Sequence, residues 1–135
     1  MPGSIDHLNP DGLHRNPAFS QVVVANRAER TIYIGMQNAI DGPTRTVIGP
    51  GDVRAQSEKT LANIEVCLTA AGAAKEHLVM WTIYLVEGHD LRAAFEPVQA
   101  WWGDRPNPPA NSVVSVSSLF VPEVLIGIEA VAVVP

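Results

Sequence analysis

Two segments near the end of the chain decide the fold: Pro109-Ala110-Asn111-Ser112 and Ile126-Gly127-Ile128-Glu129-Ala130-Val131-Ala132. The first opens a run of valines and serines, and the second is rich in isoleucine, valine and alanine. Such short runs of β-branched residues favour strands. We therefore expect the last two strands at residues 112–119 and 124–134.

The segment before them predicts a central strand and a helix. Residues 78–86 are apolar on both alternating faces and contain aromatic and β-branched side chains, which is typical of a strand covered on both sides. Residues 90–102 follow, with Asp90 as the expected helix cap. Pro97 lies inside this helix, so we expect a kink or a displaced start there.

Residues 53–71 predict the other helix, because apolar residues recur every three or four positions along one stripe. Asp52 suits its start and Gly72 its end. Before it, the apolar runs at 21–25 and 31–36 predict two strands joined as a hairpin. Residues 1–16 show no periodicity, so we expect them to form an N-terminal arm of a single domain that spans residues 1–135.

This order of elements indicates an α+β fold, in which a β-sheet carries both helices on one face. The remaining apolar strand residues are too many for two helices to cover, which favours oligomerisation through the other face. The residues in question are Val113, Val114, Val116, Ile126, Ile128 and Val131.

Composition limits the partners that we expect. The 135 residues hold 14 acidic and 9 basic side chains, for a net charge of −5, so the chain has no evident basic field for nucleic acid. It has no run of about 18 apolar residues that could span a membrane. Cys67 is the single cysteine, which excludes an intrachain disulfide and fits a reducing compartment. With no secretory-type start, we expect a cytoplasmic protein.

No motif predicts a metal or cofactor. The four histidines lack the helical i, i+4 spacing of a metal site, and none lies near the cysteine. The chain also lacks a glycine-rich nucleotide loop and the G-x-S-x-G setting of a serine hydrolase. We therefore expect no cofactor and no bound metal.

An ordered set of segments resembles the Rid family (YjgF/RidA-like, reactive-intermediate deaminases). The set is Pro17-Ala18-Phe19-Ser20-Gln21, Ile34-Gly35-Met36-Gln37, residues 100–106, and the closing tract at 109–112 and 126–130. In that family the closing tract runs Pro-Ala-Arg-Ser, an apolar strand, and Ile-Glu-Ile-Glu-Ala. Here Asn111 stands at the arginine position and Gly127 at that of the first glutamate, while Phe19 replaces a tyrosine.

The resemblance implies a chorismate-mutase-like, YjgF-like fold and a homotrimer whose sheets pack around a central axis. It also implies small-molecule clefts between subunits. Family deaminases hydrolyse imines and enamines without a cofactor. The arginine holds the substrate carboxylate, and a glutamate with backbone groups positions water.

Carried onto this chain, the resemblance gives one catalytic candidate, Glu129, and a set of substrate-binding candidates. Glu129 is two residues beyond Gly127 and so shares its strand face, about 6–7 Å away; its alternative role is to cap or pair inside a trimer. Arg105 could fold over the cleft, or it is a solvated loop arginine. Trp101 and Trp102 are interpreted as core and interface residues. The binding candidates are Phe19, Gly35, Met36, Gln37, Phe95, Arg105, Asn111, Ser112 and Gly127.

Three functions remain open at this point. The first is a divergent hydrolase of an imine, an enamine or a related small molecule. The second is a non-catalytic binding or regulatory trimer. The third, endoribonuclease activity, is disfavoured by the acidic charge. Asn111, Gly127 and Phe19 together predict a cleft for a neutral or aromatic ligand rather than a small amino-acid-derived carboxylate.

Overall fold

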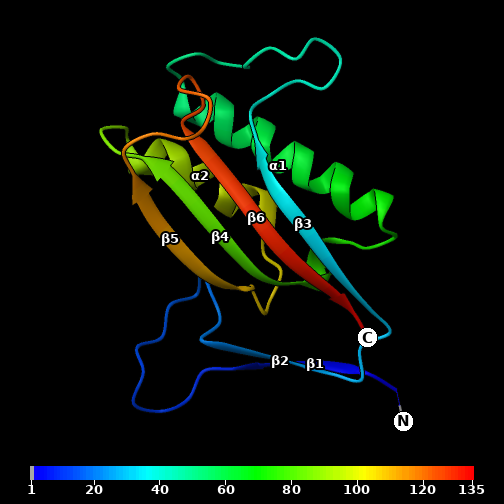
Figure 1. The fold of residues 1–135 in the computed structure, drawn as a ribbon. Helices are drawn as coiled ribbons and strands as arrows, with labels where there is room; N and C mark the ends of the chain where they lie inside the picture. Colours follow the sequence, from blue (N-terminus) through cyan, green and yellow to red (C-terminus); the bar gives the residue numbers. More distant parts are fainter. Residues whose placement is uncertain (1) are drawn as a thin grey trace.

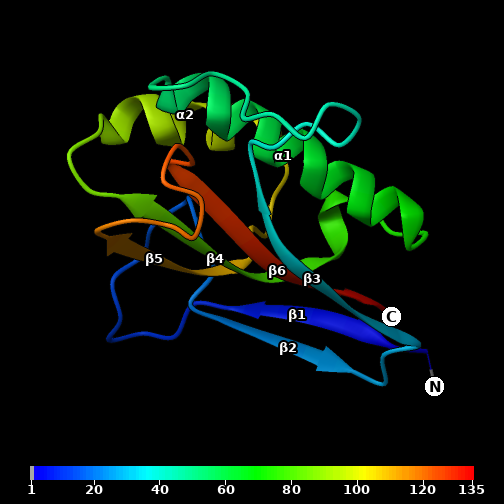
Figure 2. The ribbon, with the colours of Figure 1, turned by 45° about the horizontal axis from the view of Figure 1, so that its top comes forward.

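The computed structural model describes residues 2–135, and its main unit is a four-stranded mixed sheet. The strands lie in the order β3-β6-β4-β5; β4 and β5 are parallel, and the other neighbours are antiparallel. Both helices cover one face of this sheet (Figures 1 and 2), which confirms the predicted α+β class. The elements are β3 (Arg30–Asn38), α1 (Val53–Ala70), a short 3-10 turn (Lys75–His77), β4 (Leu78–Val86), α2 (Leu91–Trp102), β5 (Ala110–Val116) and β6 (Ile126–Val134).

A separate hairpin precedes the sheet. Its strands, β1 (Ser4–Leu8) and β2 (Val22–Asn26), pair in antiparallel fashion and lie near the C-terminal end of β6 (Figures 1 and 2). The expectation of an arm without regular structure over residues 1–16 was therefore wrong for β1. The sequence did not predict this strand because one of its two half-buried positions holds the polar His7. The half-buried residues of β1 therefore do not form an alternating apolar pattern.

The helix-covered face holds the core. Trp81, Ile83 and Leu85 of β4 alternate inward, next to apolar residues of β6. Ile126 and Ile128 are fully buried on this face, so their assignment to the uncovered face was wrong. Because side chains alternate along a strand, it is the odd-numbered residues of this stretch of β6 that take the other face, which we call the open face.

Both helices begin at the predicted caps. The Asp52 carboxylate accepts a hydrogen bond from the Ala55 N–H at 3.0 Å, and the Asp90 carboxylate accepts one from the Arg92 N–H at 2.9 Å. Each such cap stabilises its helix by about 1 kcal/mol. The second helix begins at Leu91 and runs through Pro97 to Trp102, so its start is not displaced.

Gln56 of α1 is fully buried and ties three backbone groups together. Its Nε2 donates to the carbonyl oxygens of Gly49 (3.2 Å) and Glu123 (2.9 Å), and its Oε1 accepts from the Leu125 N–H at 2.8 Å. The side chain therefore fixes the loops before α1 and before β6 against the helix.

The open face leaves large apolar side chains in solvent. Tyr33 of β3 is 80% exposed, and Val114 of β5 is 39% exposed. Phe120, in the loop between β5 and β6, is 100% exposed. Among residues 2–135, no helix has the length and apolar character needed to cross a membrane.

Candidate functional site

A pocket beside Asn111 lies between α2, the edge of the sheet and the segment before β2. Asn111 of β5 is the register partner of Trp81 on β4, and both lie on the helix-covered face. Phe95 of α2 and Phe19 of the N-terminal segment complete the aromatic part of the wall. The cavity measures about 540 Å³, which is within the usual range for small-molecule sites. We call it the Asn111 pocket; its walls are Asn16, Pro17, Ala18, Phe19, Trp81, Ile83, Phe95, Val98, Gln99, Trp102, Gly103, Pro108 and Asn111.

One wall of the Asn111 pocket is held by Ser20, which is buried. Its hydroxyl donates to the Pro108 carbonyl oxygen at 2.5 Å, and its N–H donates to the Pro109 carbonyl oxygen at 3.3 Å. His7 of β1 places Nδ1 3.0 Å from the same hydroxyl. Burial lowers the pKa of His7, against the opposing effects of the Pro108 carbonyl and Asp6, so the neutral ring is favoured. The hairpin thereby positions residues 16–19 against the start of β5.

The Asn111 pocket has no ionisable side chain in its described wall. Its polar side chains are the carboxamides of Asn16, Gln99 and Asn111. The Trp102 indole N–H donates to the Arg105 carbonyl oxygen, and the Trp81 indole N–H is buried. Within one chain, the described wall of the Asn111 pocket is therefore uncharged.

The open face carries several of the other predicted residues, among them Gly35 and Glu129. Glu129 of β6 accepts a hydrogen bond from the Tyr84 hydroxyl at 2.7 Å. This bond is the main cause that raises the pKa of Tyr84, so the hydroxyl stays protonated and donates. Glu129 also lines a shallow hollow of about 300 Å³ with Gly35 and Thr82. Ser112 is exposed and is the register partner of Thr82.

Met36 occupies the space that a side chain at position 127 would need. A β-carbon on Gly127 would lie 2.5 Å from the Met36 Sδ and 3.0 Å from its Cγ. Because Gly127 has no side chain, the Met36 thioether packs where the β-carbon of a glutamate at position 127 would lie. Gln37 lies next along β3, where its side-chain amide donates to the Gly35 carbonyl oxygen at 3.1 Å.

The predicted site residues therefore divide between two faces of one chain. Phe19, Phe95 and Asn111 meet in the Asn111 pocket, whereas Glu129 and Gly127 lie on the open face. Arg105 belongs to neither group, because its Nη1 donates to the Trp102 carbonyl oxygen at 2.8 Å, so it does not supply a charge to the Asn111 pocket. Sequence reasoning did not single out Trp81, because its pairing with position 111 depends on the order and register of β4 and β5 in the folded sheet.

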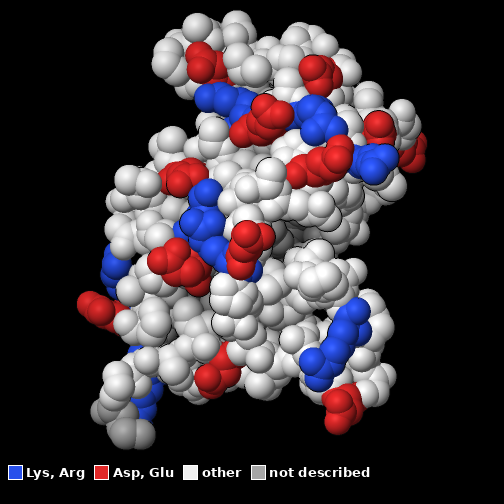
Figure 3. Space-filling model, turned by 180° about the vertical axis from the view of Figure 1, so that it is seen from behind, with Lys and Arg blue, Asp and Glu red and all other residues white. Residues whose placement is uncertain are grey.

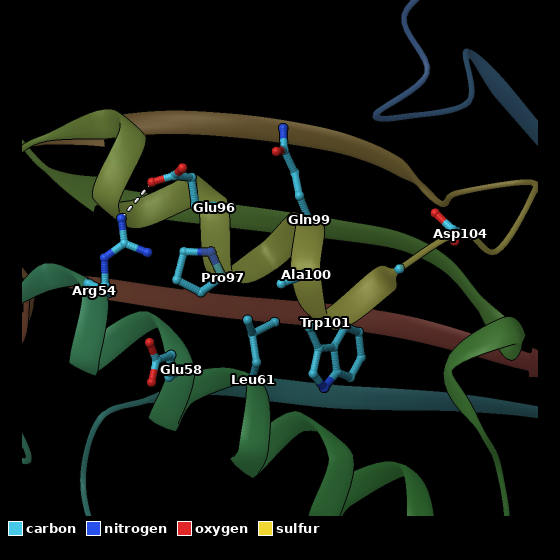
Figure 4. Close-up of a pocket in the computed structure, with 10 residues that line it drawn as sticks. Arg54, Glu58, Leu61, Glu96, Pro97, Gln99, Ala100, Trp101 and Asp104 are labelled. Carbon is cyan, nitrogen blue, oxygen red and sulfur yellow. Dashed lines mark hydrogen bonds and ion pairs between the residues drawn. The ribbon is translucent and has the colours of Figure 1, made fainter.

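A second groove lies between α1 and α2 and measures about 720 Å³ (Figure 4). It is larger than the Asn111 pocket, and its lining combines the buried Leu61 and Pro97 with exposed polar and charged side chains. The basic side chain in this groove, Arg54, is already ion-paired, since its guanidinium lies 2.5 Å from the Glu96 carboxylate. Acidic and basic side chains alternate over this face of the molecule and form no continuous basic area (Figure 3). The described residues contain no cluster of three or more His, Cys, Asp or Glu side chains suited to a metal ion.

Comparison with known proteins places this geometry in a family. The family model described as Endoribonuclease L-PSP matches residues 13–134. The RutC family protein slr0709 of Synechocystis is 32% identical over 117 residues, which cover 87% of this chain and 86% of that protein. The chain belongs to the endoribonuclease L-PSP family. This is the family that includes the YjgF, RutC and Rid proteins, so the resemblance in the sequence is confirmed.

Solved structures of this family share the fold. A Rid-family protein of unknown function, YyfB of Yersinia pestis, superposes with a TM-score of 0.84 at 30% identity, over 96% of this chain and 98% of that chain. The YjgF gene product of E. coli gives 0.68 at 30% identity, over 76% and 80%. TdcF of E. coli, solved with bound serine, gives 0.71 at 20% identity, over 88% and 94%, and this likeness concerns the fold alone.

Proposed function

We propose that this L-PSP-family protein is a homotrimer that binds a small, uncharged organic molecule in the Asn111 pocket. The observation that carries the proposal is the absence of any ionisable side chain from the described wall of that pocket. A carboxylate buried there would lose hydration without gaining a counter-charge, and such burial is costly. Asn111 offers two N–H donors but no charge.

Binding without rapid turnover is the favoured form of this function. Hydrolysis of an imine needs a group that positions water and transfers protons. The carboxylate suggested for that role, Glu129, lies on the open face and is bonded to Tyr84. Within one chain, Glu129 and the Asn111 pocket are on opposite faces of the sheet.

A divergent hydrolase is the second proposal, and the exposed Tyr84–Glu129 pair supports it. If trimers place the open face of one subunit beside the Asn111 pocket of the next, Glu129 of an adjoining copy supplies a carboxylate. Glu129→Gln would then abolish most turnover of a neutral imine while leaving ligand affinity unchanged. Steady-state rates and a binding isotherm on the same preparation distinguish this form from simple binding.

We predict that the wild-type protein hydrolyses 2-iminopropionate poorly and that Asn111→Arg/Gly127→Glu improves it by about tenfold or more, the value of one charge-assisted contact. Because a glutamate at position 127 needs the space that Met36 fills, the substitutions are made together with Met36→Ala. The proteins compared are therefore Met36→Ala/Asn111→Arg/Gly127→Glu and its matched control, the Met36→Ala single variant. The measurement is the initial rate of imine hydrolysis. Equal rates in the two proteins, or rapid turnover by the wild type, would show that these positions do not define the site.

A further inference from the structure

We infer that the groove between α1 and α2 binds a short segment of a partner protein, in which two basic side chains flank an apolar one. We call this groove of about 720 Å³ the helix groove (Figure 4). The inference does not depend on the ligand of the Asn111 pocket, because none of the side chains that carry it lines that pocket.

The floor of the helix groove is apolar. Leu61 of α1 and Pro97 of α2 are buried there, and the half-buried Trp101 and the exposed Ala100 continue the apolar surface along α2. Leu61, Pro97 and Trp101 lie in the space between the two helices (Figure 4). The part of this floor that remains in contact with water is stabilised when an apolar side chain covers it.

Carboxylates lie on both sides of this floor. The helix groove contains three acidic side chains, those of Glu58, Glu96 and Asp104, and one basic side chain, that of Arg54. Arg54 pairs with Glu96, which also lies 3.9 Å from the Arg92 guanidinium. Neither Glu58 nor Asp104 takes part in an ion pair formed within residues 2–135. The charge of the helix groove is therefore complementary to a basic partner.

The chain itself holds a lysine beside Trp101. The Lys75 Nζ lies 4.4 Å from the centre of the Trp101 ring and 3.5 Å from the Glu65 carboxylate, and it donates to the Trp101 carbonyl oxygen at 3.0 Å. An aromatic ring and a carboxylate together thus suit an ammonium group at this edge of α2. Trp101 and Asp104 offer the same two kinds of group to a cation that arrives from outside.

The shape of the helix groove favours a peptide over a small molecule. Small-molecule sites enclose most of their ligand, whereas this groove is open to solvent along its length. From position 54 to position 61, α1 rises by about 10 Å. An extended chain places the side chains of residues i, i+2 and i+4 on one side within about 13 Å. A segment of the pattern Lys-x-Leu-x-Lys therefore sets its leucine on the floor and a lysine near each of the two carboxylates.

The position of the helix groove leaves it accessible in an assembly. Both helices cover one face of the sheet (Figures 1 and 2), whereas the proposed trimer forms through the open face. The partner segment and the neighbouring subunits therefore bind to different sides of the chain.

The test titrates the isotope-labelled full-length protein with acetyl-Lys-Ser-Leu-Ser-Lys-amide and follows the backbone amide signals. We expect selective shifts for residues that line the helix groove. We expect Glu58→Gln/Asp104→Asn to weaken binding about fivefold, the effect of two exposed ion pairs. The matched control is Glu29→Gln/Glu87→Gln, which removes two exposed carboxylates outside the helix groove and gives the same net charge. Its affinity should equal that of the wild type.

Two control peptides separate the contributions of charge and apolar contact. Acetyl-Glu-Ser-Leu-Ser-Glu-amide reverses both charges and should not bind. Acetyl-Lys-Ser-Ser-Ser-Lys-amide removes the apolar side chain and should bind about fivefold more weakly, since it forfeits part of the burial of one leucine.

Several results would overturn the inference. They are the absence of shifts in the helix groove at millimolar peptide, equal affinities of Glu58→Gln/Asp104→Asn and its control, and equal affinities of the leucine and serine peptides. Putrescine that binds as tightly as the leucine peptide would assign the helix groove to a small diamine and would also overturn it. The amide spectrum of each variant reports its folding; if the groove variant does not fold, the three peptides compared on the wild type decide the question.

Discussion

Replacing Gln56 with methionine is expected to lower the free energy of unfolding by about 3 kcal/mol. The side chain is completely buried and pairs with the carbonyl oxygens of Gly49 and Glu123 and the N–H of Leu125. Methionine has a similar length but cannot donate, and its sulfur accepts weakly. The backbone groups would be left in the interior without partners, which costs more than the loss of one exposed hydrogen bond.

Urea denaturation followed by tryptophan fluorescence measures this loss. Gln99→Met, at an exposed position of α2, is the matched control and should change the unfolding free energy by less than about 0.5 kcal/mol. A Gln56→Met protein as stable as this control would show that the loops before α1 and before β6 do not depend on Gln56.

Introducing a charge on the open face is expected to break the proposed trimer into single chains. Val131 of β6 is the register partner of Tyr33 on β3 and of Met80 on β4, so it lies near the middle of the sheet. In a trimer, Val131→Glu would bury three like charges in an apolar contact, and unpaired buried charges are strongly unfavourable. We expect light scattering to give about 43.5 kDa, three 14.5 kDa chains, for the wild type and the mass of one chain for the variant.

Thr69→Glu adds the same charge to the exposed surface of α1 and is the control for this experiment. It should leave the molar mass unchanged, because α1 covers one face of the sheet (Figure 2) and the alternation of β6 places Val131 on the other, open face. A wild-type protein that remains a single chain at working concentration would contradict the proposed assembly.

Periodicity predicted both helices and most strands but not the strand pairing. The expected hairpin between the strands at 21–25 and 31–36 was wrong, because β2 pairs with β1 and β3 pairs with β6 in the other sheet. The strand at 78–86 agrees with the structure because its apolar run is long and unbroken. The helix beginning at residue 53 also agrees, because its buried positions recur every three or four residues although Gln56, Ser57 and Thr60 among them are polar. β1 escaped prediction because its inward positions include the polar His7, whose ring hydrogen-bonds to Ser20, a residue distant in the sequence. The face of Ile126 and Ile128 was misassigned because sequence alternation gives two faces but does not say which one the helices cover.

The candidate site was predictable in part. Asn111 and Phe19 line the same pocket, and its described wall within one chain holds no ionisable side chain; whether this is the predicted inter-subunit cleft stays a prediction. The separation of Gly127 and Glu129 from Asn111 depends on strand order, since β4 lies between β5 and β6 and the residues face opposite ways. The unpaired N–H of Trp81 depends on what the rest of the fold places around it, which no local pattern specifies.

The central claim is that the Asn111 pocket accepts neutral ligands and rejects anions. Isothermal titration of the wild-type protein with benzamide and benzoate tests it directly, because the two molecules have nearly the same shape and differ in charge at neutral pH. We expect benzamide to bind at least about tenfold more tightly, a difference of about 1.4 kcal/mol. If benzoate binds as tightly as benzamide, or more tightly, the claim is contradicted. That result would indicate that a cationic group outside the described wall of the pocket pairs with the benzoate carboxylate.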